Sequence, residues 1–102
     1  MNTANLQLEG LYLAVAALNE ALVSKGALTR GEVDEALRRA EAVALGDERA
    51  AEDLSPANRD AVAFPARLLA LANHAAARGE TPGFAALARL VGSTKAPYND
   101  QR

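Results

Sequence analysis

Apolar residues recur along the first quarter of the chain with the spacing of an α-helix. The large ones step by three or four positions, namely Leu8, Leu11, Val15, Leu18 and Leu22. Such a stripe covers one face of a helix and is expected to face the core. The pattern predicts a helix over about residues 4–25, ended by Gly26 in a left-handed cap.

The second predicted helix has the most clearly marked start. Thr29 and Glu32 have the spacing of a capping box, in which each side chain accepts a hydrogen bond from the backbone amide of the other residue. The pattern predicts a helix from Thr29 to Gly46. Its inner stripe is predicted to be Val33, Leu37, Ala40 and Ala44. Acid-before-base pairs one turn apart are expected on its outer side, at Asp34–Arg38 and Glu35–Arg39.

Two further helices are marked by a hydroxyl residue followed by proline. Ser55-Pro56 predicts the start of a helix that ends at Gly79. Pro65 lies inside this pattern and predicts a kink or a split there, because proline lacks the amide donor and its ring clashes with the preceding turn. Thr81-Pro82 predicts a short helix that ends at Gly92, followed by an irregular tail over residues 93–102.

These elements predict an all-α fold, a compact bundle of about four helices in a single domain over residues 1–102. Short loops are expected to make the first two helices antiparallel neighbours. The composition agrees, because 25 of the 102 residues are alanine and neither isoleucine nor tryptophan occurs. Alanine favours helix, but it fills little volume, so the core is expected to be thin.

The composition also limits the chemistry. The chain has no cysteine, which excludes disulfides, thiol catalysis and cysteine-ligated metals. Its one histidine, His74, lies off the apolar face of its helix and is expected to be a solvated surface residue rather than a base or metal ligand. No phosphate-binding glycine loop or nucleophile elbow occurs. We therefore expect a non-enzymatic protein without a cofactor.

The N-terminal residues bear on the cellular location of the protein. Residues 1–10 contain no lysine or arginine, and the strongest apolar run, residues 11–18, is only eight residues long. A secretory signal needs a basic start and a bilayer span needs roughly 20 residues, so we expect a cytoplasmic protein without a membrane segment.

Residues 1–53 carry a net charge of −5 and residues 54–102 one of +3. This division favours packing of the two halves, or head-to-tail pairing of two chains.

A second apolar stripe on the first helix predicts self-association. Leu6, Leu13 and Ala17 lie roughly opposite the main face, with Tyr12 to one side. A helix that is apolar on two sides is either central in its own domain or shared with a partner. Both interpretations stay open here. The first points to burial within the chain, and the second to a homodimer through Leu6, Tyr12, Leu13 and Ala17.

Two other segments offer alternative functions. A polar cluster at the Ser55–Asp60 turn could hold a small ligand or a docking partner together with the tail, using Ser55, Asn58, Arg59, Asp60 and Tyr98. Ordinary capping and internal ion pairs explain the same residues. Residues 84–96 have the Ala88–Gly92 spacing of a helix-turn-helix start and offer nucleic-acid binding as an alternative. No basic recognition helix follows and the net charge is −2, which argues against this alternative.

Several blocks of the sequence resemble a group of small bacterial all-helical proteins of unknown function. The blocks are Glu-Asp-Leu-Ser-Pro-Ala-Asn-Arg-Asp-Ala-Val (52–62), Arg-Leu-Leu-Ala-Leu-Ala-Asn (67–73), Thr-Lys-Ala-Pro-Tyr-Asn-Asp-Gln (94–101) and Lys-Gly-Ala-Leu-Thr (25–29). The resemblance covers nearly the whole chain and implies no activity or site residue. The residues themselves favour an adaptor or regulatory protein that self-associates and binds an unknown protein partner.

Overall fold

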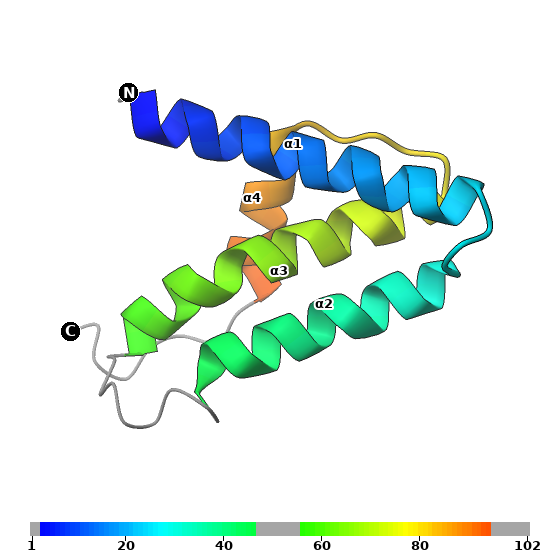
Figure 1. Ribbon diagram of the computed structural model, residues 1–102. Coiled ribbons are helices and arrows are strands. Elements are labelled where there is room, and N and C mark those ends of the chain that lie inside the picture. The colour runs from blue at the N-terminus through cyan, green and yellow to red at the C-terminus, as the bar shows by residue number, and fades with distance from the viewer. Residues whose placement is uncertain (1–2, 47–55, 95–102) are drawn as a thin grey trace.

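The computed structural model describes residues 3–46 and 56–94, which form four α-helices and no strand within those ranges. The helices are α1 (Thr3–Ser24), α2 (Arg30–Leu45), α3 (Pro56–Ala77) and α4 (Phe84–Thr94), as Figure 1 shows. The all-α prediction and the number of helices are confirmed. The predicted cap at Ser55 lies outside the described residues.

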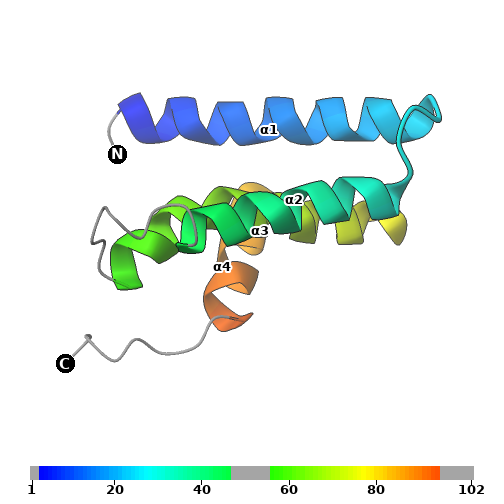
Figure 2. The same cartoon turned by 60° about the horizontal axis from the view of Figure 1, so that its bottom comes forward.

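Helix α3 is the centre of the arrangement, because it packs against each of the other three helices. In Figure 2, α1 lies on one side of the α2–α3 layer and α4 lies on the other. Helices α1 and α2 run in opposite directions, but they make little contact with each other. The predicted antiparallel course of the two helices is present, but the inward face of α1 packs mainly against α3 rather than α2.

The predicted capping box at the start of α2 is present. The Glu32 amide donates to the Thr29 hydroxyl at 3.0 Å, and the Thr29 amide donates to the Glu32 carboxylate at 2.8 Å. At the other end, the amide of Gly46 donates to the carbonyls of Ala42 and Val43. These bonds satisfy backbone groups that a helix end otherwise leaves unpaired.

Helices α1 and α3 end in the same way, at glycines with a positive φ. Gly26 has a φ of 78° and Gly79 has a φ of 75°, a conformation that other residues adopt at a steric cost. After α1, the Ala27 amide donates to the Leu22 carbonyl at 3.0 Å, and after α3 the Glu80 amide reaches the Ala75 carbonyl at 2.9 Å. These are Schellman motifs, and they confirm both predicted helix ends.

The structure changes three predictions about the later helices. Helix α3 continues without a break through Pro65, so it is not split there, while the kink stays a prediction. Helix α4 begins at Phe84 rather than at Pro82, because the carbonyl of Gly83 accepts the first helical bond, from the Leu87 amide at 3.1 Å. It also passes through Gly92 to Thr94, because Gly92 does not adopt a positive φ.

The continuation of α4 shortens the predicted irregular tail. Ser93 and Thr94 are helical, and the Ser93 hydroxyl donates to the Leu90 carbonyl at 2.9 Å. Residues 95–102 of the predicted tail lie outside the described residues.

The core is thin and rich in alanine. Among the described residues, the buried apolar ones are Val33, Ala44, Ala63, Ala66, Leu68, Leu69, Ala75, Leu87 and Val91. Leu68, Leu87 and Val91 form one cluster, where α3 meets α4. In the predicted inner stripe of α2, Leu37 is half-buried and Ala40 is exposed, which corrects the prediction for Ala40. The half-buried Glu41 turns toward α3 instead, where it pairs with Arg67.

Helix α1 is rotated away from the orientation that its main stripe predicts. None of its residues is buried, and the leucines of that stripe are 39–64% exposed: Leu8, Leu11, Leu18 and Leu22. Only Val15 of the predicted core face is half-buried. The inward sector carries Tyr12, Ala16 and Glu20 instead. By length and composition alone α1 is long and apolar enough to cross a membrane. The core helix of a soluble protein and a signal sequence near an N-terminus meet the same criterion.

Candidate functional site

A polar junction holds three helices together at one end of the bundle. Arg30, the first residue of α2, reaches Glu20 of α1 with both of its terminal nitrogens, at 2.8 and 3.1 Å from the two carboxylate oxygens. The same guanidinium donates to the side-chain oxygen of Asn73 in α3 at 2.9 Å. The Asn73 amide returns a bond to the Arg30 carbonyl at 3.1 Å. One arginine therefore links α1, α2 and α3.

The junction changes the acid–base behaviour of its members. The hydrogen bonds from Arg30 hold the pKa of the Glu20 carboxyl below its usual range. The same bonds raise the pKa of the Arg30 guanidinium. Asn73 is only 3% exposed, so its side-chain bonds matter, because a buried polar group without a partner is costly. The junction therefore fixes the rotation of α1 about its axis.

An aromatic cluster holds α1 at a second point. Tyr12 stacks on Phe84 with ring centroids 5.5 Å apart, and it meets Phe64 edge-on at 6.1 Å. Burial raises the pKa of the Tyr12 phenol. Tyr12 therefore packs within its own chain, while its place in a homodimer surface stays a prediction. The aromatic pairing with α3 and α4 selects this side of α1 as the inward side.

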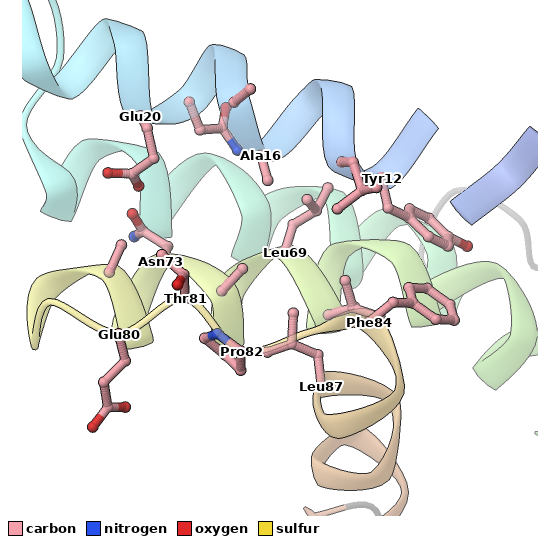
Figure 3. A pocket seen from close by; sticks show the side chains of 16 residues that line it. Tyr12, Ala16, Glu20, Leu69, Asn73, Glu80, Thr81, Pro82, Phe84 and Leu87 are labelled. Carbon is pink, nitrogen blue, oxygen red and sulfur yellow. The ribbon is translucent and has the colours of Figure 1, made fainter. Parts of the chain in front are cut away.

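A groove lies between α1, α3 and the segment that leads into α4 (Figure 3). Its volume is about 220 Å³. The walls are mainly apolar and include Leu13, Ala16, Ala17, Leu69, Ala72 and Phe84. The Tyr12–Phe84 pair lies at one end of the groove, while Glu20, Asn73 and Thr81 gather toward the other end (Figure 3).

The charged groups around this groove are already paired. Two lining residues are acidic, Glu20 and Glu80, and the lining contains no lysine, arginine or histidine. Glu20 is held by Arg30, and Glu80 accepts from Arg78 at 3.1 Å. Figure 3 shows the Glu80 carboxylate pointing away from the cavity. The groove therefore presents an apolar surface with hydrogen-bonding groups at one end and no uncompensated charge.

Part of the predicted homodimer surface belongs to this groove. Leu13 and Ala17 line it, whereas Leu6 is exposed and is not part of the lining. The sequence predicted these α1 residues as part of a homodimer surface or of burial within the chain, and not of a groove. The opposite wall, including Ala72 and Pro82, was missed because nothing in the local sequence shows that residues 68–87 fold back against α1.

The polar turn predicted as a ligand or docking site does not line this groove. Ser55 and Tyr98 lie outside the described residues, and Asn58 is exposed. Asp60 pairs with Arg67 at 3.0 Å, and Arg67 also reaches Glu41 at 2.7 Å. For Asp60, the alternative explanation of an internal ion pair is confirmed.

Arg59 is another described residue of the predicted ligand or docking site. It lies beside Gly46, where an added Cβ would be 3.9 Å from the guanidinium carbon. The Glu41–Arg67 pair joins the acidic first half of the chain to the basic second half, as the charge division predicts.

His74 is a surface residue, as predicted, with 47% of its side chain exposed. Its Nε2 lies 2.8 Å from a carboxylate oxygen of Asp34. The sequence did not predict this contact, because Asp34 belongs to α2.

The two ion pairs predicted on α2 are present. Asp34 pairs with Arg38 at 2.8 Å, and Glu35 pairs with Arg39 at 3.0 Å, so both predictions are confirmed. In the described part of the chain, no group of three potential metal ligands forms.

Helix α4 directs its apolar face inward. Leu87 and Val91 are buried, and Phe84 packs against them. Arg89 is the basic residue of α4, and Lys95 lies outside the described residues. No contact of the described residues favours the nucleic-acid alternative for residues 84–96.

Comparison of the chain with protein-family models, with curated proteins and with solved structures gave no match.

Proposed function

We propose that this chain is a non-enzymatic, cytoplasmic interaction protein that self-associates through α1 and acts as an adaptor or regulatory partner. One observation carries the proposal. Helix α1 has no buried residue, although it bears a continuous outer leucine stripe, which we define as Leu8, Leu11, Leu18 and Leu22. Contiguous exposed apolar patches of this kind mark interaction sites on soluble proteins.

A second copy of the chain suits this surface. The charged residues of α1 are Glu9 and Glu20, both half-buried, so the outer leucine stripe carries no charge of its own. Two such stripes can pack across a two-fold axis, where each copy offers the same patch and no like charges meet. Fully burying a leucine contributes about 1.5–3 kcal/mol. Completing the burial of several half-exposed leucines is therefore a substantial driving force.

The contacts of α1 favour a protein partner over a lipid bilayer. A membrane-crossing α1 would separate Glu20 from Arg30 and Tyr12 from its aromatic partners. An interfacial helix binds lipid headgroups with lysine and arginine on its polar face. Residues 3–24 contain neither of these residues.

Sedimentation velocity of the purified chain at micromolar concentrations tests the proposal. We expect a dimer for the natural chain and a monomer for the double variant Leu11→Gln/Leu18→Gln. Val62→Gln is the matched control, because Val62 is similarly exposed but lies on α3. A monomeric natural chain, or a dimer that survives the double variant, would overturn the proposal.

Leu13→Gln separates the two sides of α1 in the same experiment. Leu13 lines the groove and does not belong to the outer leucine stripe, so this variant is expected to stay dimeric. Dissociation by Leu13→Gln alone would contradict the assignment of the interface to the stripe and move it to the groove side.

A further inference from the structure

We propose that the groove between α1, α3 and residues 80–84 binds a small uncharged molecule with an apolar body and one hydroxyl or amide group. The proposal is independent of self-association, because the outer leucine stripe does not line the groove. It rests on three properties of the groove: its size, the character of its walls and the pairing of the charges around it.

The size of the groove suits a small molecule. The groove holds about 220 Å³. Pockets for drug-sized ligands are about 300–1,000 Å³. The occupant is therefore smaller than a typical drug.

The walls select an apolar body. Side chains from three separate segments converge on the groove, among them Leu13 of α1, Leu69 of α3 and Pro82 of the connecting segment. Leu69 is also buried in the core, so this wall is fixed in place. Ligand sites commonly combine such apolar walls with a few placed polar groups.

The polar end selects a neutral hydrogen-bonding group. Asn73 and Thr81 lie at this end beside Glu20 (Figure 3). The Glu20 carboxylate is already engaged by Arg30 on both oxygens, so an ammonium group there would add a second cation to a compensated pair. A carboxylate would meet no lining cation. Burying an uncompensated charge is costly, whereas a hydroxyl can donate to Glu20 or Thr81 and accept from Thr81.

The dimensions along α1 fix the orientation of the ligand. Tyr12 and Glu20 are eight residues apart, which corresponds to about 12 Å along a helix. The apolar body would lie toward the Tyr12–Phe84 pair, with the hydroxyl or amide near Thr81. A short linear alcohol fits within this distance.

Nuclear magnetic resonance titration of the full chain tests the proposal with three probes of equal length: 1-hexanol, hexanoate and hexylammonium. We expect saturable shifts of groove amides, such as those of Ala72 and Thr81, with 1-hexanol. Both charged probes should bind at least about tenfold more weakly, because their charge would be uncompensated in the groove. Equal binding of either charged probe, or no saturable shift with 1-hexanol, would overturn the assignment.

Groove-filling variants locate the site. Ala16→Leu and Ala72→Leu each place a larger side chain in the lining and should weaken 1-hexanol binding at least about tenfold. Ala21→Leu is the matched control, because Ala21 is an exposed residue of α1 outside the lining. Circular dichroism identifies which variants keep the fold, and either folded lining variant suffices for the test.

The double variant of the outer leucine stripe separates this proposal from the proposed function. Leu11→Gln/Leu18→Gln should abolish the dimer and leave 1-hexanol binding unchanged. Loss of 1-hexanol binding in that variant, or full binding by a folded groove-filling variant, would show that the probe binds the exposed leucines instead.

Discussion

Helix α1 and the α2–α3 pair are built from similar residues but are held in different ways. In α2 and α3 the apolar stripes close on each other, so that Val33, Ala44 and Ala63 are buried. In α1 no residue is buried, and the helix is held by an aromatic cluster and a polar junction. An apolar stripe therefore does not by itself decide which face of a helix turns inward. Specific polar and aromatic partners decided it for α1.

The sharpest way to test this comparison is to delete the same side chain in both regions. Leu68→Ala in α3 removes a side chain that is only 2% exposed and should destabilise the fold by about 2–5 kcal/mol. Leu18→Ala in α1 removes one that is 64% exposed and should change stability by less than about 0.5 kcal/mol. Urea unfolding of both variants at low protein concentration, where self-association is minimal, provides the measurement. Equal losses would show that α1 is packed as tightly as the core.

The polar junction should have a smaller effect than the core. Asn73→Ala removes the partner of the Arg30 guanidinium and of the Arg30 carbonyl, and it should cost about 1–3 kcal/mol. Hydrogen exchange should then accelerate in α1 before it does in α3. The control is Arg39→Ala, which breaks an exposed pair on α2 and should cost less than about 1 kcal/mol. A uniform acceleration across all helices would contradict the special role of the junction for α1.

The smallest expected effect is the change in the free energy of unfolding at acid pH that comes from the Glu20 carboxyl. Because the pKa of Glu20 is lowered in the folded chain, its pairing with Arg30 stabilises the fold above the unfolded pKa. That stability is lost as the pH falls through the folded pKa. The effect should stay below about 1 kcal/mol, because Glu20 is 44% exposed and solvent screens the pair.

Comparison with Glu20→Gln measures the acid response. Unfolding experiments between about pH 6 and pH 3 should show a steeper loss of stability for the natural chain than for Glu20→Gln. The raised pKa of Arg30 contributes nothing in this window, since arginine stays protonated throughout it. Parallel stability curves would rule out a contribution from the Glu20–Arg30 pair.

The fold was largely predictable from local signals. The capping box at Thr29 and the glycines at positions 26 and 79 encode helix ends through backbone chemistry, and these predictions are confirmed. Gly92 shows the limit of such a signal. A glycine permits a left-handed cap but does not require one, and α4 continues through it.

The groove could be predicted only in part. The second stripe of α1 contains Leu13 and Ala17, which form one wall. The other wall comes from residues that are 50 or more positions away, such as Ala72 and Pro82, and their approach depends on how α3 and the connecting segment fold back. Likewise, the aromatic partners that help fix the rotation of α1, Phe64 and Phe84, are distant in sequence. Helical periodicity contains no information about such contacts.

The alanines of the core affect the entropy that the side chains lose on folding. Four of the nine buried apolar residues in the described ranges are Ala44, Ala63, Ala66 and Ala75. A methyl side chain has no rotamers to lose, so burying it incurs none of the side-chain entropy penalty that a longer residue incurs on folding. The small hydrophobic gain at these positions is therefore retained in full. A scarcity of bulky residues and a low entropic cost of ordering are two results of the same choice of residue.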